Sequence, residues 1–412
     1  MITKLQTTQQ KIISFFYRHP EAFVWMVSEF YAFKPGEIEK HFKQLDVRLL
    51  SNNYYSEWDA KRIRMFKDEL DWPLFSVSCR SFADVDLIDQ FLNEIVWESI
   101  DNENVCCGLS SNPKVRWTEE LIAKYENKID FTDLSYVETI PWTETLIDEY
   151  IDRWDWKNIS FQTSLPWSEQ LLAKYENYWD WDFIELNENI PWTVPLVEKY
   201  FHRFDHIRNS AFERHRVLTS DVEIIEEFSD YLCWYSISSN SKLPWEEMNL
   251  LERWKDKINW WGLSLNEFFL RDPQFFENNL YKWMIDPVSS FRELSCCKAL
   301  PWSISLIERF SEYWNWDKLS VNDSLPWSSE LIDRFIDRWE WGNFEPLEDD
   351  AYADAGESGL IGNSGIPWDI DLIIRYEDFI DIDVLQRDWR IWDKAFKAHV
   401  NEKMVDTVFR LI

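Results

Sequence analysis

Glycine is scarce in this chain, with 8 residues among 412. An all-β protein needs glycine at many tight turns, so this shortage argues against an all-β fold. Cysteine is also rare, with six residues, and the adjacent pairs Cys106-Cys107 and Cys296-Cys297 match neither a disulfide framework nor a CxxC zinc site. We therefore expect reduced thiols, no bound metal and a cytoplasmic protein.

Targeting signals and long apolar runs are missing as well. The first residues, MITKLQTTQQKIISFF, lack the apolar core and the cleavage site of a secretory signal. No run of about 18 apolar residues occurs, so we expect no helix that spans a membrane.

Basic residues are in the minority, with 43 Lys and Arg against 75 Asp and Glu and a formal net charge of −32. A surface this negative repels nucleic-acid phosphate and anionic lipid, so we expect neither nucleic acid nor a membrane as a direct partner. The partner that this charge favours is another protein with a basic surface.

Tryptophan, in contrast, is abundant and regularly spaced. The chain has 27 tryptophans, and the tripeptide Ile/Leu-Pro-Trp ends at Trp142, Trp167, Trp192, Trp245, Trp302, Trp327 and Trp368. Several of these lie 25 residues apart, and Arg-Trp takes the same register at Trp117. The spacing predicts an all-α protein, an α-solenoid (superhelix) of about thirteen two-helix repeats.

The copy that begins at Trp167 illustrates the predicted unit. Ser168 is a suitable N-cap for a first helix, in which Leu171 and Tyr175 share one apolar face. Asp180 is positioned to cap a second, short helix. A unit of 25 residues is too small to bury its aromatic side chains alone, so we expect most tryptophans to form a core between neighbouring units.

Serine and asparagine also recur at fixed positions near the end of the second helix. Ser135, Ser160 and Ser320 occupy one such position, and Asn112 and Asn322 another, two residues after a serine. Residues of this kind most simply close backbone hydrogen bonds at a turn. A repeated binding ladder is the alternative.

The pattern Leu-Ser-x-Asn-x-x-Leu-Pro-Trp-Ser-x-x-Leu-Ile, followed by Trp-Asp-Trp, resembles a Trp-rich tandem repeat of bacterial proteins, with looser relatives in giant viruses. The resemblance covers residues 110–206 and 234–345, and more weakly the first hundred residues. It implies a solenoid and a microbial, cytoplasmic origin, but no activity, because none is known for this repeat.

One departure from the repeat is basic. Between residues 201 and 219 the chain has four arginines and three histidines against two acidic residues, and the Trp-Asp-Trp motif is replaced by Phe204-Asp205-His206. Arginine can hold carboxylates in two-point contacts, so we predict partner-binding residues here: Arg203, Arg208, Arg214, Arg216, His202 and His206. The alternative is that these arginines pair with neighbouring carboxylates of the fold.

The predicted organisation has three parts. Residues 1–32 form an N-terminal helical cap, interrupted near Pro20, and residues 384–412 form a C-terminal helical cap. The repeats occupy residues 33–383 and include an acidic, Gly-rich insert at 345–365, which we interpret as a mobile surface loop. This loop is either a decoration or a partner contact.

No signature of enzyme chemistry occurs: the chain has no GxSxG motif, no Cys–His signature and no nucleotide-binding fingerprint. We therefore expect no catalytic residues and no cofactor. The sequence favours a non-enzymatic binding or scaffold protein with an acidic concave surface. The alternative is an acidic inhibitor of a basic enzyme, such as a toxin-immunity or anti-restriction protein that mimics the charge of nucleic acid.

Overall fold

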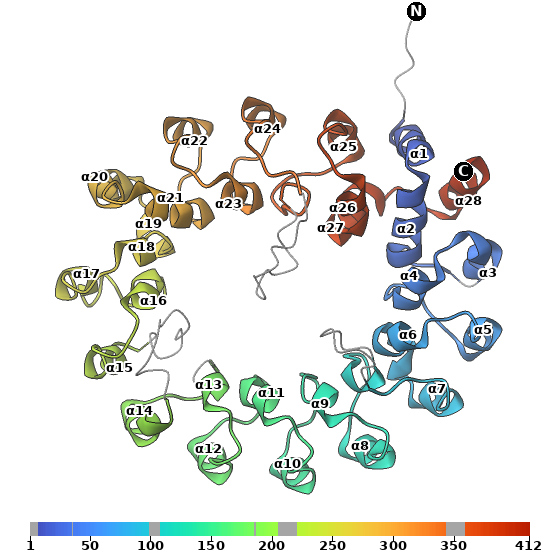
Figure 1. Cartoon of the computed structure of the whole chain (residues 1–412), viewed down its shortest axis with the longest axis horizontal. Helices are drawn as coiled ribbons and strands as arrows, with labels where there is room; N and C mark the ends of the chain where they lie inside the picture. Colours follow the sequence, from blue (N-terminus) through green and yellow to red (C-terminus); the bar gives the residue numbers. More distant parts are fainter. Residues whose placement is uncertain (1–6, 35, 99–107, 185–186, 205–220, 343–358) are drawn as a thin grey trace, which may run out of the picture. The chain divides into compact units, whose positions relative to one another are not determined.

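The regular elements in the described part of the chain are all helices, as the sequence predicts. The computed structural model describes residues 7–34, 36–98, 108–184, 187–204, 221–342 and 359–412 (Figure 1). None of the helices in these segments has the length and apolarity needed to cross a bilayer.

The chain divides into two compact units, one formed by residues 24–208 and the other by residues 1–23 together with 209–412. We call them the 24–208 unit and the terminal unit. Helix α2 (Pro20–Phe30) crosses the boundary between them. The further helices of the 24–208 unit are α3 (Glu37–His41), η1 (Phe42–Gln44), α4 (Val47–Asn52), α5 (Ala60–Phe66), α6 (Trp72–Ser78), η2 (Arg80–Ala83), α7 (Val85–Gln90), η3 (Leu109–Ser111), α8 (Glu119–Tyr125), α9 (Phe131–Leu134), α10 (Glu144–Glu149), α11 (Trp156–Phe161), α12 (Glu169–Lys174), α13 (Trp181–Ile184), α14 (Val194–Tyr200) and η4 (Phe201–Arg203).

The terminal unit brings the first described helix against the last ones. It contains α1 (Thr8–Arg18), α15 (Val222–Glu227), α16 (Trp234–Ser239), α17 (Leu250–Arg253), α18 (Trp260–Leu263), α19 (Glu267–Leu270), α20 (Pro273–Trp283), α21 (Pro287–Cys296), α22 (Ile304–Arg309), α23 (Trp316–Val321), α24 (Ser329–Arg334), α25 (Ile370–Arg375), α26 (Ile382–Arg387), α27 (Trp389–Ile391), the π-helix η6 (Trp392–Phe396) and α28 (Glu402–Leu411).

Helix α1 packs on α25 and α28. The rings of Phe15 and Phe396 lie 5.9 Å apart, and Arg18 forms an ion pair with Glu377 at 2.7 Å. As expected, the helical segment at the start is interrupted at Pro20, because α1 ends at Arg18 and α2 begins at Pro20. The predicted boundary between residues 383 and 384 lies within α26.

Each regular repeat has two helices, and polar side chains fix where both begin. In the copy from Trp167, the Ser168 hydroxyl accepts a hydrogen bond from the Leu171 N–H at the start of α12. The Asp180 carboxylate accepts one from the Asp182 N–H at the start of α13. Capping side chains satisfy N–H groups that a helix leaves free at its start. Figure 1 shows the first helices α8, α10 and α12 in one row and the second helices α9, α11 and α13 in another.

Neighbouring repeats are joined through buried serines near the end of the second helix or its equivalent, which we call ladder serines. Each accepts a hydrogen bond at 2.9–3.1 Å from a backbone N–H of the next repeat, and in seven of the nine cases this N–H lies at the start of that repeat's second helix. These serines are Ser28, Ser51, Ser76, Ser110, Ser135, Ser160, Ser238, Ser295 and Ser320.

A second set of buried side chains, the ladder amides, completes the joint. Each donates to the carbonyl oxygen of the preceding repeat's ladder serine at 2.6–3.0 Å. These residues are Asn53, Asn112, Gln162, Asn187, Asn266, Asn322 and Asn363. The structural interpretation of the recurring Ser and Asn residues is therefore confirmed. They are bonded inside the fold and do not form a binding ladder.

Most tryptophans contribute to the core, as predicted: thirteen are buried and twelve are partly buried. Only Trp261 and Trp389 are exposed, at 46% and 55%, and all 27 tryptophans lie in the described residues. Within one repeat, Trp167 packs against Trp179, with ring centroids 5.0 Å apart, and the Trp179 indole N–H donates to the Leu172 carbonyl. Each indole ring that packs in this way buries a large apolar surface away from water.

The predicted insert at 345–365 is shorter than the sequence indicates. Residues 345–358 lie outside the described residues, whereas Leu360 and Ile361 are fully buried. Asn363 is a ladder amide. Gly359 begins this segment at a φ of +55°, and a Cβ there would lie 2.4 Å from the Glu340 carbonyl oxygen. Residues 359–365 thus belong to the repeat, because their apolar and amide side chains complete its core.

Candidate functional site

The predicted basic segment is described only at His202 and Arg203, which end the short helix η4. His202 is exposed, whereas Arg203 is half-buried and forms an ion pair with Glu176 at 2.8 Å. His206, Arg208, Arg214 and Arg216 lie outside the described residues. The prediction is therefore tested only at His202 and Arg203.

Arginines at the same position in other repeats also contact the preceding repeat, as Arg203 does. Arg153 and Arg338 stand at the same repeat position, 11 residues after the first tryptophan. Arg153 donates to the Glu126 carbonyl oxygen at 2.7 Å, and Arg338 pairs with Glu312 at 2.8 Å. Arg203 is thus one of several arginines that join successive repeats, which is the structural alternative for this residue.

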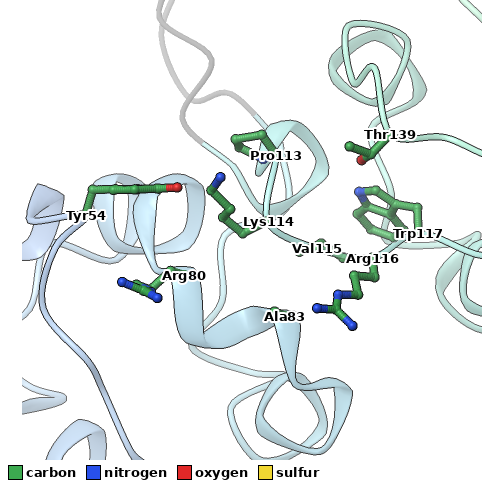
Figure 2. Close-up of a pocket in the computed structure, with 9 residues that line it drawn as sticks. All are labelled: Tyr54, Arg80, Ala83, Pro113, Lys114, Val115, Arg116, Trp117 and Thr139. Carbon is green, nitrogen blue, oxygen red and sulfur yellow. The ribbon is translucent and has the colours of Figure 1, made fainter. Parts of the chain in front are cut away.

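A different group of cations lines a pocket of ≈ 500 Å³ in the 24–208 unit (Figure 2). Arg80 comes from η2, while Lys114 and Arg116 come from the turn that precedes α8. We call these three residues the cation cluster. The remaining lining residues are Tyr54, Ala83, Pro113, Val115, Trp117 and Thr139. Among the described residues, no carboxylate lines this pocket and none forms an ion pair with the cation cluster.

The ladder holds the turns that carry the cation cluster in place. The Asn112 amide donates to Ser76 and Cys79 carbonyl oxygens at 2.8 and 3.2 Å, and its own oxygen accepts from the Lys114 N–H. Asn112 and Cys79 are buried, whereas the three cations are exposed. The Lys114 ammonium lies over the ring of Tyr54, 5.0 Å from its centroid. A cation over an aromatic face is attracted by the ring quadrupole.

A departure from the repeat contributes one of these cations. Arg116 stands where seven repeats have the proline of Ile/Leu-Pro-Trp. The indole N–H of buried Trp117 has no hydrogen-bond partner among the described residues. The corresponding indole N–H is bonded in Trp327, which donates to the Asn322 carbonyl at 2.9 Å, but it also lacks a partner among the described residues in Trp142 and Trp192. Sequence reasoning missed this pocket, although Arg-Trp in place of Pro-Trp at 116–117 was a signal that could have pointed to it.

Exposed aromatic side chains form a second distinctive surface in the same unit. Tyr136 and Phe161 are 56% and 52% exposed, and with half-buried Phe183 they line a pocket of ≈ 460 Å³. We call these three residues the aromatic patch. Phe161 and Phe183 meet edge to face, and the Lys157 ammonium lies 5.1 Å from the centre of the Phe183 ring. Tyr136 and Phe161 directly follow two ladder serines, so a fixed backbone presents them.

A few buried titratable groups have shifted pKa values. Burial raises the pKa of Glu29 to about 7, the hydrogen bond from Asn52 opposes this rise and nearby Asp46 adds to it. Burial likewise raises the pKa of the Cys79 and Cys297 thiols, to about 12 and about 11. A carboxyl that titrates near 7 suits acid–base chemistry. However, the only side-chain hydrogen bond that Glu29 makes within the described residues is to Asn52, so we assign it no catalytic role.

Within the described residues, no three His, Cys, Asp or Glu side chains are grouped as metal ligands would be. Comparisons with known protein families, with curated proteins and with solved structures gave no match for this chain.

Proposed function

We propose that this protein is a non-enzymatic binding protein, an α-solenoid of about thirteen repeats that holds a partner protein with a basic surface. The observation that supports this proposal best is the aromatic patch. Large exposed aromatic side chains on a rigid backbone are typical anchors of protein–protein interfaces, because little conformational freedom is lost when they are covered.

The aromatic patch also departs from the repeat in a way that stability does not require. At the position of Tyr136 and Phe161, other described repeats have smaller side chains: Asn52, Val77, Ser111, Ser239, Cys296 and Val321. These repeats make the same ladder without an exposed ring. Two neighbouring repeats that each expose a ring therefore support a contact surface.

Charge supports the choice of partner. The net charge of −32 attracts a basic protein and accelerates its association. An acidic inhibitor that mimics nucleic acid would need an uninterrupted stripe of free carboxylates. On the first helices, several carboxylates pair instead with a lysine of the next repeat, as in Asp148–Lys174 at 2.8 Å and Glu169–Lys199 at 3.1 Å. We therefore place the binding protein before the inhibitor.

Two further elements of the proposal are its compartment and a second contact region. Cys79, Cys233, Cys296 and Cys297 are free thiols, which supports a reducing compartment such as the cytoplasm. On sequence grounds we keep the basic segment at 201–219 as a second region that contacts the partner.

Affinity capture from the native host, compared between variants, tests the proposal. The test variant replaces Tyr136 and Phe161 by serine, the residue at the corresponding positions 111 and 239. The control variant replaces Tyr281, which is 64% exposed and lies outside the aromatic patch, by serine. We expect a basic protein that the native chain and the control retain but the test variant loses, with a Kd weakened by about tenfold or more when measured with the purified partner. Equal capture by all three chains would contradict the proposal.

A further inference from the structure

The cation cluster is unusual because three cations of this acidic chain line one pocket whose described lining contains no carboxylate. Lys298 makes the clearest comparison with Arg80, since each directly follows a buried cysteine, Cys297 or Cys79. The Lys298 ammonium forms an ion pair with Asp323 at 3.0 Å. Asp323 directly follows a ladder amide, Asn322, in the next repeat.

At the corresponding position after Asn112, the chain has Pro113. Proline cannot pair with Arg80, and the next residue, Lys114, adds a positive charge. Arg116 then adds a second one in place of the usual proline. Three changes in the turn at residues 112–117 thus remove a partner carboxylate and add two positive charges near Arg80, and none of them alters the ladder.

We propose that this pocket binds a small molecule that carries two or more phosphate or carboxylate groups. Two guanidinium groups can each hold an oxyanion through paired N–H donors, and the Lys114 ammonium adds a third charge. A volume of ≈ 500 Å³ lies within the usual range of small-molecule sites.

The negative charge of the whole chain limits where an anionic ligand can bind. A protein with a net charge of −32 repels anions over most of its surface. An anion that binds must therefore meet a local group of cations that its neighbours do not neutralise. The cation cluster meets this condition among the described residues. The assignment does not depend on the proposed protein-binding function, because it uses none of the aromatic patch.

Isothermal titration of the full chain with pyrophosphate and with citrate tests the assignment, since one probe carries phosphate and the other carboxylate groups. We expect at least one of them to bind at low salt with a Kd below about 1 mM and to weaken as salt rises. Tighter binding of pyrophosphate would identify a phosphorylated ligand, and tighter binding of citrate a polycarboxylate. Absence of binding by both probes would overturn the assignment.

Variants locate the site. Arg80→Gln with Lys114→Gln should weaken binding by about tenfold or more, because two charge-assisted contacts are lost. The matched control is Lys298→Gln with Lys242→Gln, which removes two charges at the corresponding turn positions and should change Kd by less than about twofold. Equal weakening in both double variants would indicate a general charge effect and contradict the assignment.

A third variant, Pro113→Asp, restores the acid that is found at Asp323. It should pair with Arg80 and weaken anion binding by about tenfold or more, because the new carboxylate competes with the ligand. Circular dichroism and the melting temperature verify that each variant is folded. Unchanged binding by folded Pro113→Asp would also contradict the assignment.

Discussion

Two turns with the same backbone role differ in what they offer to a ligand. Residues 112–117 (NPKVRW) and 322–327 (NDSLPW) both begin with a ladder amide, which donates to a ladder serine's carbonyl oxygen at 2.8 and 2.9 Å. In the second turn Asp323 pairs with Lys298, and the indole N–H of Trp327 donates to the Asn322 carbonyl oxygen. At the first turn, Arg80, Lys114 and Arg116 have no carboxylate partner among the described residues, and the indole N–H of Trp117 has no hydrogen-bond partner there.

The comparison separates what a repeat needs in order to fold from what it is free to change. The buried amide is the same in both turns, and its loss would leave backbone groups of two repeats without partners. The exposed residues that follow it differ in charge and in hydrogen bonding. Differences between repeats that bear on ligand binding are therefore to be sought at the exposed residues beside the ladder and not at the buried ladder itself.

The largest effect should come from the ladder amides. Asn112→Ala and Asn322→Ala should each lower the free energy of unfolding by about 3 kcal/mol or more, because each leaves buried carbonyl and N–H groups unsatisfied. Urea unfolding followed by circular dichroism measures the loss. Asn127→Ala, at an exposed position, is the control and should change stability by less than about 0.5 kcal/mol. A small effect at 112 with a large one at 322 would show that the two turns do not share a backbone role.

A smaller effect should follow from exchanging the residue before the tryptophan. Arg116→Pro should stabilise the protein by about 0.5–1 kcal/mol, because proline restricts the unfolded chain and fits this position in seven repeats. Pro326→Arg should cost a similar amount for the same reason. Melting temperatures of the two variants measure both changes. If Arg116→Pro destabilises the fold, the backbone of the first turn differs from that of the second.

The sequence was sufficient for the repeat, because its signals lie within 25 residues of one another. The caps at Ser168 and Asp180 and the buried tryptophans follow from local spacing and from the need to cover aromatic side chains. The recurrence of Ser160 and Asn322 also indicated closed hydrogen bonds. The spacing did not show that these bonds join neighbouring repeats.

The packing of α1 on α25 and α28 had no sequence signal, because the amphipathic faces of these helices could fit many surfaces. The pocket was missed for a related reason. Arg80 and Arg116 are 36 residues apart by number, and the hydrogen bonds from Asn112 to Ser76 and Cys79 join their turns. Arg203 was predicted from local charge alone, and charge does not reveal that Glu176 lies beside it.

The smallest effect concerns the ion pair that only the second turn has. Burial alone would raise the pKa of Asp323, but Lys298 and the hydroxyls of Ser364 and Ser324 outweigh burial, so the pKa is lowered. A carboxyl whose pKa is lower in the folded state stabilises the fold above its unfolded pKa of about 3.9 and loses this contribution as pH falls through the folded value. Because both groups are partly exposed, we expect the ion pair to contribute less than about 1 kcal/mol to the free energy of unfolding.

Urea unfolding of Asp323→Asn should therefore show a slightly weaker loss of stability below pH 4 than the native chain. Lys114→Gln should lose as much stability below pH 4 as the native chain does. If the native chain and Asp323→Asn lose the same stability below pH 4, the Lys298–Asp323 ion pair contributes nothing measurable to stability. The two turns would then not differ in stability through charge pairing.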